Sequence, residues 1–215
     1  MTAIKPKVDI EKLNLHYGAF HALKDINMQI DEHKITAFIG PSGCGKSTIF
    51  RLVNKLLTPD AGRVLVNGQQ IESLKNYCGY MPQHDLLFPW RTVRENVMLP
   101  MEIQGGYTKA EMLERADEAL ASVGLSDWGQ KSPRELSGGM RQRAAFARTV
   151  LTGSDLLLLD EPFSALDYLT RLSMREWLLE QWQRDQKTVL FITHDVEEAP
   201  VIDSTYMAAV RMIED

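Results

Sequence analysis

Cysteines are scarce in this sequence, and it has no long hydrophobic run. The 215 residues include two cysteines, Cys44 and Cys78, and their spacing matches no metal-binding pattern, so we expect no zinc or redox role. The longest uninterrupted apolar runs, at 156–159 and 189–192, fall far short of the roughly 20 residues that cross a membrane. Residues 1–10 lack the apolar centre of a signal peptide. We therefore expect a protein of the cytoplasm.

An excess of positive charge is also missing. The formal net charge is −5 at pH 7, whereas nonspecific nucleic-acid binding usually requires a positive surface that displaces counterions from phosphates. A local basic cluster of Arg134, Arg141, Arg143 and Arg148 is more simply interpreted as a solvated or salt-bridged face. We therefore expect no nucleic-acid partner. The length suits one globular domain, which we assign to residues 1–215.

Strand patterns begin the chain and recur along it. Alternating apolar residues predict strands at 8–15 and 26–30, which we expect to form an antiparallel lobe. A buried strand at 35–39 then runs into a glycine-rich turn. Further strands are predicted at 63–66, 77–81, 155–160 and 189–193.

Helical patterns separate these strands. The first helix, at 47–57, is expected to place Leu56 on its inner side, and a capping box of Thr108 and Glu111 begins a helix that Gly124 ends. Other helices are predicted at 92–104, 139–152 and 169–186. The order predicts an α/β fold with a mostly parallel core sheet, an N-terminal antiparallel β lobe and an inserted helical lobe at about residues 84–150.

A glycine-rich loop with a lysine follows the strand at 35–39. Its sequence fits GxxxxGK[ST], in which backbone N–H groups turn onto phosphates, Lys46 supplies charge near the β and γ phosphates, and the Ser47 hydroxyl ligates magnesium. An ordinary glycine-rich turn is the alternative, but the strand before the loop and the helix after it favour nucleotide binding. The residues predicted to contact the phosphates of ATP are Gly40, Pro41, Ser42, Gly43, Cys44, Gly45, Lys46, Ser47 and Thr48.

A pair of acidic residues ends the most apolar strand. Leucines at 156–159 lead into Asp160 and Glu161, and ligands bind parallel sheets at the carboxyl ends of the strands. There Asp160 can hold magnesium through water, while Glu161 faces the attacking water as its base. A carboxylate that only caps the strand is the alternative, and the nearby phosphate loop disfavours it.

Seven sequence elements occur in a fixed order. They are Tyr17, the phosphate loop, Gln83, LSGGMRQR at 136–143, the Asp160–Glu161 pair, SALD at 164–167 and His194. Over about residues 8–200 this set resembles the ATPase subunits of ABC transporters. The resemblance implies a P-loop NTPase fold of the ABC ATPase type that hydrolyses ATP with Mg²⁺.

The resemblance assigns roles to three of these residues. Tyr17 resembles the aromatic residue that stacks on adenine. Gln83 resembles the glutamine that reaches magnesium and water, and His194 the histidine that holds the γ phosphate and positions water with Glu161. Taken alone, each has a plainer interpretation: a surface tyrosine, an ordinary loop glutamine and a histidine at the edge of the core.

The LSGG segment implies a partner subunit. Ser137, Gly138 and Gly139 resemble the signature that contacts the γ phosphate of ATP on the opposite subunit, and a helix N-terminus with glycines leaves backbone donors for an anion. Since the chain has one phosphate loop and one such segment, two copies arranged head to tail would complete two sites, with Asp167 at their interface. A helix N-cap followed by a small-residue contact is the alternative for LSGG alone.

Residues 84–90, from His84 to Trp90, place large apolar side chains in a loop, which usually indicates a partner or a contact between lobes. In the ABC family this region docks a cytoplasmic helix of the membrane permease subunit. The sequence is most similar to importer ATPases for nitrate, sulfonate, taurine and thiamine precursors. We therefore expect a peripheral importer subunit on the inner face of the cell membrane, in a complex with a solute-binding protein. The alternatives are an exporter or cell-envelope ATPase, a non-transport ABC protein and a nonenzymatic nucleotide sensor.

The end of the chain departs from the family pattern. Pro200 stands where a helix former is usual, and only 21 residues follow His194. We therefore expect a shortened helix after His194, a short C-terminal part and a last strand at 206–210.

Overall fold

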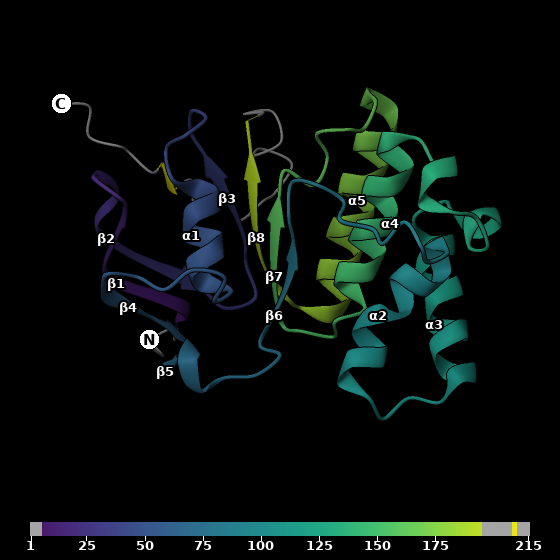
Figure 1. Ribbon diagram of the computed structural model, residues 1–215, viewed down its shortest axis with the longest axis horizontal. Helices are drawn as coiled ribbons and strands as arrows, with labels where there is room; N and C mark the ends of the chain where they lie inside the picture. Colours follow the sequence, from purple (N-terminus) through teal and green to yellow (C-terminus); the bar gives the residue numbers. More distant parts are fainter. Residues whose placement is uncertain (1–5, 195–207, 210–215) are drawn as a thin grey trace. The chain divides into compact units, whose positions relative to one another are not determined.

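The computed structural model describes residues 6–194 together with the backbone of 208–209 (Figure 1). The chain forms two compact units: unit 1 comprises Met1–Tyr77 and Arg184–Asp215, and unit 2 comprises Cys78–Gln183. Pro200 and its neighbours lie outside the described residues, so the shortened helix expected after His194 stays a prediction.

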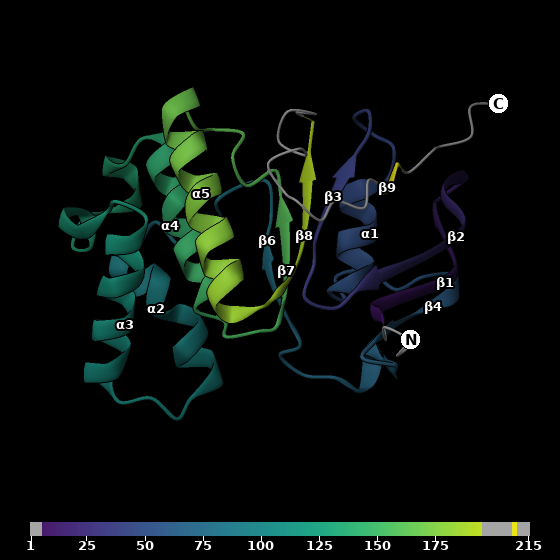
Figure 2. The ribbon, with the colours of Figure 1, turned by 180° about the vertical axis from the view of Figure 1, so that it is seen from behind.

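An antiparallel sheet makes up the first part of unit 1 (Figure 2). Its strands are β1 (Pro6–Tyr17), β2 (Phe20–Asp31), β4 (Ala61–Val66) and β5 (Gln69–Gln70), in the order β2-β1-β4-β5. Alternate side chains of a strand share a face, so Val8 and Ile10 are buried together. A register shift in β1 follows Ile10, and beyond it the buried residues are Leu13 and Leu15. The predicted antiparallel lobe is therefore present, with longer strands than the pattern indicates.

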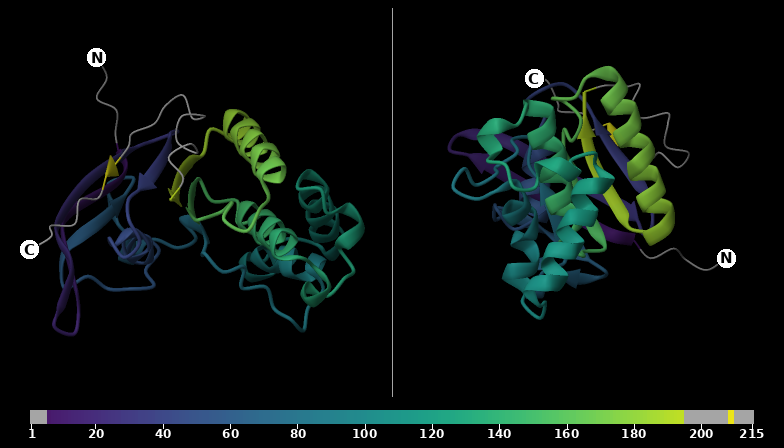
Figure 3. Two further views of the ribbon diagram at one scale, coloured as in Figure 1. Left: turned by 90° about the horizontal axis from the view of Figure 1, so that it is seen from above. Right: turned by 90° about the vertical axis from the view of Figure 1, so that its right-hand side faces the viewer.

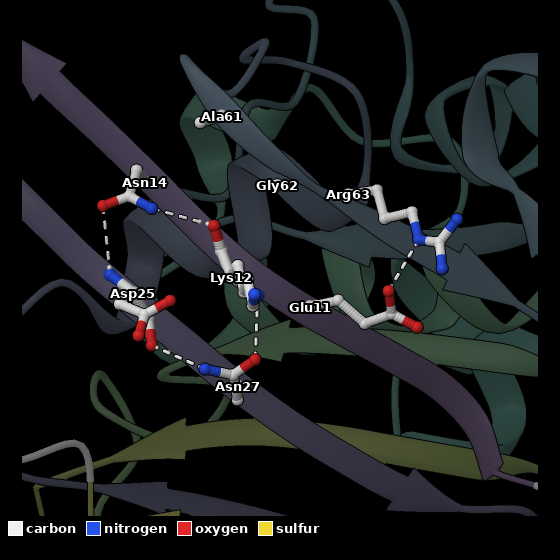
Figure 4. A pocket seen from close by; sticks show the side chains of 8 residues that line it. All are labelled: Glu11, Lys12, Asn14, Asp25, Asn27, Ala61, Gly62 and Arg63. Atoms are coloured by element: carbon white, nitrogen blue, oxygen red, sulfur yellow. Dashed lines mark hydrogen bonds and ion pairs between the residues drawn. The ribbon is translucent and has the colours of Figure 1, made fainter.

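An irregularity in this sheet forms an open depression of about 700 Å³ (Figure 4). Lys12 of β1 and Asp25 of β2 both have a left-handed backbone, with φ of 48° and 47°. Asn27 Oδ1 accepts a hydrogen bond from Lys12 N at 2.9 Å, and Asn14 Oδ1 accepts one from Asp25 N at 3.1 Å. The two asparagines thus satisfy backbone donors that a regular ladder would pair across strands.

Parallel strands form the second part of unit 1. Strand β3 (Ile35–Ile39) pairs in parallel with β8 (Thr188–Thr193) and with β9 (Ala208–Ala209). Every residue of β8 is buried, as expected for a parallel strand that is covered on both faces. Helix α1 (Lys46–Val53) follows β3, and the short helix η1 (Ile71–Ser73) follows β5.

Helix α1 ends earlier than the sequence pattern predicts. The helix expected at 47–57 stops at Val53, because Asn54 caps it and Lys55 adopts a left-handed φ of 63°. Leu56, which we expected on the inner side of the helix, is 64% exposed. That expectation is wrong, since a left-handed residue after the last turn directs the chain away from the helix.

Unit 2 combines two parallel strands with helices (Figure 3). Strand β6 (Cys78–Met81) pairs in parallel with β7 (Leu156–Asp160). The helices are α2 (Val93–Gln104), α3 (Lys109–Ser122), α4 (Gly138–Val150) and α5 (Tyr168–Asp185), with the short helices η2 (Ser126–Trp128) and η3 (Pro133–Glu135). Helices α2, α3 and α4 pack on one another. Phe146 of α4 meets Trp177 of α5 edge to face, with ring centroids 5.2 Å apart.

The predicted fold class is confirmed. Parallel strand pairs occur in both units, the antiparallel lobe lies in unit 1, and helices predominate in unit 2. Across the described ranges, no helix combines the length and the apolar composition that a membrane span needs.

Capping boxes begin several helical segments of unit 2. The pairs are Thr92 with Glu95, Thr108 with Glu111, and Ser132 with Glu135. In each pair the N-cap side chain accepts a bond from the first helical turn, and the glutamate accepts one from the N-cap backbone. That backbone hydrogen bond is the main reason why the pKa of each glutamate lies below its usual value.

Candidate functional site

The phosphate loop joins β3 to α1. Gly43 and Gly45 have φ of 82° and 92°, a region that side chains rarely adopt, and Gly45 is the N-cap of α1. A Cβ atom at Gly45 would also lie 2.7 Å from Leu23 Cδ2, but that is the end of a flexible side chain, so the positive φ is the stronger reason for glycine there. Pro41, Ser42 and Gly43 are exposed. The loop thus leaves its outer surface and the N-terminus of α1 open to an anion, which fits the triphosphate of ATP.

Lys46 folds back over this loop. Its Nζ donates to Gly40 O at 2.7 Å and to Pro41 O at 2.8 Å, and its side chain is buried. Cys44, whose Sγ lies 3.5 Å from the same ammonium, is also buried, so its thiol fills space below the loop. An ammonium group held by neutral carbonyl oxygens has stronger acceptors in phosphate oxygens, because charge-assisted hydrogen bonds are stronger than neutral ones.

His194 leaves β8 beside the phosphate loop. Thr193 is the parallel partner of Ile39, so the next residues, His194 and Gly40, emerge from the same end of neighbouring strands. His194 is exposed there. This end of a parallel sheet is where ligands bind. Unit 1 therefore brings the histidine and the phosphate loop together.

Tyr17 lies at the end of the β1–β2 hairpin. It is 46% exposed and pairs with Phe20, whose ring is also exposed. On the opposite face, the His16 and His21 rings stack with centroids 3.9 Å apart. Asp60 anchors His16, and the hydrogen bond from the His16 side chain lowers the pKa of Asp60. The hairpin is thus fixed on its histidine face and presents an open aromatic face.

The acidic pair lies at the end of β7 in unit 2. Asp160 is the last strand residue and is 3% exposed. Glu161 follows with a left-handed φ of 52°. Gln83, two residues after β6, donates from Nε2 to Glu161 Oε2 at 3.0 Å. Because β6 and β7 are parallel neighbours, the glutamine and the glutamate meet at the carboxyl ends of both strands.

The oxygen donors expected to hold magnesium suit that ion. Mg²⁺ prefers hard oxygen ligands and keeps several waters or phosphate oxygens. The Ser47 hydroxyl lies on α1 in unit 1, and the Asp160 carboxylate and the Gln83 amide lie in unit 2. In the part of the chain that the structure describes, no three His, Cys, Asp or Glu side chains converge on a metal position. Phosphate oxygens and waters are the further ligands that Mg²⁺ usually takes.

The signature segment begins α4. Ser137 is the N-cap, and its Oγ accepts a hydrogen bond from Met140 N at 3.2 Å. Ser137 and Gly138 are exposed. A Cβ atom at Gly139 would lie 3.1 Å from Ala165 O, so this glycine lets α4 approach the SALD segment closely. The N-cap and small-residue contact that we considered as the alternative are therefore both present, beside an exposed helix N-terminus.

Gln142 is a site residue that the sequence analysis missed. It is 5% exposed, and its amide bonds the segment after β7: Nε2 donates to Glu161 O at 2.9 Å and Ser164 Oγ at 3.3 Å, and Oε1 accepts from Ala165 N at 2.9 Å. Helical spacing was the available signal, since Gln142 shares a buried face with Phe146 and Thr149, four and seven residues later.

Asp167 closes the SALD segment as the cap of α5. Its Oδ1 accepts from Thr170 N at 3.0 Å and its Oδ2 from Thr170 Oγ1 at 2.6 Å. The side-chain hydrogen bond from Thr170 is the main cause of the lowered pKa of Asp167. Asp167 is exposed, as an interface residue must be in a single subunit.

Arginines of α4 hold the start of the loop at 84–90. Arg141 Nε donates to Asp85 Oδ2 at 3.0 Å, and Arg148 donates to Asp85 O at 2.7 Å and Leu86 O at 2.9 Å. Arg143 donates to Val123 O at 2.7 Å, at the end of α3. Of the predicted basic cluster, Arg141 thus forms a salt bridge, and Arg143 and Arg148 bond backbone carbonyl oxygens.

The rest of this loop presents aromatic surface. Trp90 is 75% exposed and stacks on Phe88, with ring centroids 4.9 Å apart. Leu86 is also exposed, whereas Leu87 is buried. The apolar side chains available to a partner are therefore those of Leu86, Phe88 and Trp90.

Comparisons with known proteins agree on one family. The family model described as "ABC transporter" matches residues 23–164. The formylaminopyrimidine import ATP-binding protein ThiZ of Halalkalibacterium halodurans is 43% identical over 91% of this chain and 76% of that protein. The nitrate import ATP-binding protein NrtD of Synechocystis sp. is 46% identical over 85% of this chain and 68% of that protein. A dimeric post-hydrolysis structure of the ATP-binding cassette MJ0796, bound to ADP and Pi, has a TM-score of 0.85 and 29% identity, with 94% of each chain covered.

Proposed function

This chain belongs to the ABC transporter family, and from that premise we propose that it is the ATP-hydrolysing subunit of a solute importer. Relatives more than 40% identical to it are named for the import of nitrate and of formylaminopyrimidine. The transported solute is proposed to come from the group of nitrate, sulfonate, taurine and thiamine precursors, which are small polar molecules. The identity of the permease that copurifies with the chain tests this part of the proposal.

The phosphate loop is proposed to bind the triphosphate of ATP. Backbone N–H groups of residues 42–48 surround the phosphates, and Lys46 moves from loop carbonyls to phosphate oxygens. Tyr17 stacks on the adenine. Ser47, Asp160 and Gln83 would hold Mg²⁺, whose charge neutralises the phosphate oxygens when it is bound.

Glu161 is proposed to act as the base in hydrolysis. Its carboxylate takes a proton from water while the water oxygen bonds the γ phosphorus, and the bond from that phosphorus to the bridging oxygen breaks to release ADP. Gln83 orients the carboxylate through the 3.0 Å bond to Oε2. His194 holds the γ phosphate and positions the water. The observation that carries this assignment is the acidic pair at the end of a buried parallel strand, with Gln83 on the carboxylate.

A second copy of the chain is proposed to complete each site. Ser137, Gly138 and Gly139 would contact the γ phosphate of ATP on the opposite subunit, and Asp167 would lie at the interface. The dimeric cassette that resembles this chain supports such a pair. Leu86, Phe88 and Trp90 would dock the permease at the cytoplasmic face of the membrane, and a solute-binding protein would deliver the solute to the permease.

Replacing the proposed base tests the hydrolytic assignment. Glu161→Gln keeps the shape of the side chain but removes the proton acceptor, so the rate of phosphate release should fall by about 100-fold or more while ATP stays bound. Glu111→Gln is the matched control and should keep the wild-type rate, because Glu111 accepts hydrogen bonds from Thr108 N and Thr108 Oγ1 in the capping box of α3. An E161Q protein that hydrolyses ATP at the wild-type rate would show that another group is the base.

A further inference from the structure

A buried amide connects the signature helix to the proposed base. Gln142 lies in the second turn of α4, and its side-chain hydrogen bonds reach the segment at 161–165. A glutamine at a core position costs free energy unless its donors and acceptor are satisfied. Leucine or alanine would fill a helix face without that demand. The buried amide of Gln142 is therefore best explained by its hydrogen bonds to the segment at 161–165.

Glu161 needs external support for its backbone. A left-handed φ of 52° is unfavourable for a residue with a Cβ atom. Pro162 follows, and a proline restricts the preceding residue to extended backbone, so both preferences oppose the observed conformation. Such a conformation persists where the surrounding structure over-determines it.

Hydrogen bonds to the backbone carbonyl oxygen of Glu161 provide that support. Its oxygen accepts hydrogen bonds from Gln142 Nε2 at 2.9 Å, Ser164 N at 3.2 Å and Ser164 Oγ at 3.1 Å. Ser164 belongs to the same turn, so it cannot anchor the turn to the rest of unit 2. Gln142 can, because it extends from α4 and also accepts the bond from Ala165 N at 2.9 Å.

We propose that Gln142 is a positioning residue for hydrolysis: it holds the left-handed backbone of Glu161 and thereby aims the carboxylate. Gln83 donates a hydrogen bond to the carboxylate of Glu161, and Gln142 donates one to the backbone carbonyl oxygen of the same residue. The inference rests on the proposed role of Glu161 as the base. It adds that the signature helix and the base of one subunit form one rigid structure, which Gly139 supports by its close contact with Ala165.

Two substitutions of Gln142 separate positioning from packing. Gln142→Met keeps the volume and removes the hydrogen bonds, so kcat for MgATP hydrolysis by the full chain should fall by about 10- to 100-fold, since a small misplacement of a reacting group has effects of this size. The KM for ATP should change by less than about twofold, since the hydrogen bonds of Gln142 reach the segment at 161–165 and its substitution leaves the residues of the phosphate loop unchanged. Gln142→Glu keeps an acceptor for Ala165 N but loses the donor at neutral pH. Its kcat relative to the wild type should rise as the pH is lowered, because a protonated carboxyl group can donate to Glu161 O.

Thr149→Val is the matched control for a buried polar loss on the same helix. Thr149 is buried, and its Oγ1 donates to Ala145 O at 2.9 Å within α4. This variant should lower the unfolding temperature as Q142M does but keep the wild-type kcat. If Q142M and T149V lose stability equally and both keep kcat, Gln142 has a structural role alone and the inference fails.

The Glu161→Gln background distinguishes the two hypotheses. If Glu161 is the base and Gln142 acts through it, Q142M should lower the residual rate of E161Q no further. A wild-type rate in E161Q would overturn the role of Glu161 itself. A slow E161Q protein combined with a fully active Q142M protein would leave that role intact and overturn only the positioning by Gln142.

Discussion

Single residues show where backbones approach too closely for a side chain. Gly62 of β4 has φ of 88°, and a Cβ atom there would lie 2.3 Å from Lys12 O and 2.5 Å from Glu11 O. These are backbone atoms of the shifted part of β1, which cannot move as a flexible side chain can. Gly62→Ala should therefore lower the free energy of unfolding by about 3 kcal/mol or more, combining the left-handed backbone with the clash. Urea denaturation of both proteins measures this difference.

Gly18→Ala separates the two contributions. Gly18 has φ of 60° in the β1–β2 turn, and nothing lies within 4 Å of a Cβ atom placed there. This substitution should lower the free energy of unfolding by about 1 kcal/mol, because the left-handed backbone is unfavourable for alanine and no clash is added. Equal losses in the two variants would show that β1 relaxes away from residue 62.

At the same scale, chemistry is easier to predict from sequence than conformation. The motif at 40–47 identifies Lys46 and Ser47, because backbone donors, a positive charge and a hydroxyl have few other uses in that order. Nothing in the sequence indicates that Glu161 has a left-handed backbone, since its type and the following proline predict the opposite. Gln142 was missed because a polar residue between arginines is expected to face solvent.

Among the elements, the capped helical segments of unit 2 should make stability depend on acid. The pKa of Glu95, Glu111 and Glu135 is lowered from 4.5, mainly by the bond from the N-cap backbone. A lowered folded-state pKa means that the unfolded chain binds more protons, so this contribution is present above pH 4.5 and is lost as the pH falls through the folded pKa. Urea midpoints should therefore fall as the pH is lowered below about 4.5.

Replacing all three glutamates by glutamine tests the origin of that slope. The substitutions E95Q, E111Q and E135Q keep a side-chain acceptor at each position and remove the titrating charge. The triple variant should be less stable than the wild type at pH 7 and show a shallower loss below pH 4.5. An unchanged acid slope would assign it to other carboxylates.

The elements themselves follow the sequence where local rules and packing agree. The strand at 35–39 and the capping box of Thr108 and Glu111 occur as predicted, because burial and capping are encoded within a few residues. The end of α1 does not, since the left-handed Lys55 is a residue that normally continues a helix. Strands β1 and β2 are longer than the apolar patterns that predict them. A register shift in β1 moves the buried positions from even-numbered residues such as Ile10 to odd-numbered residues such as Leu13, which interrupts the alternation.

At the scale of the whole molecule, the proposed pairing of subunits makes a prediction about mixtures. Lys46→Ala removes the charge of the phosphate loop, and Gly138→Asp places a negative side chain at the exposed start of α4. Each pure protein should hydrolyse ATP at a small fraction of the wild-type rate. In a head-to-tail pair of the two variants, one site combines the intact loop of one subunit with the intact signature of the other.

Mixing the two inactive variants should therefore restore hydrolysis. A one-to-one mixture that pairs at random contains half mixed dimers, each with one of two sites intact, so the phosphate release rate should reach about a quarter of the wild-type rate if the sites act independently. Equilibrium binding separates the defects: the G138D protein alone should bind ATP as the wild type does, because its own phosphate loop is unchanged. If the signature acted within its own chain, each mixed dimer would hold two defective sites, and the mixture would stay as inactive as its components.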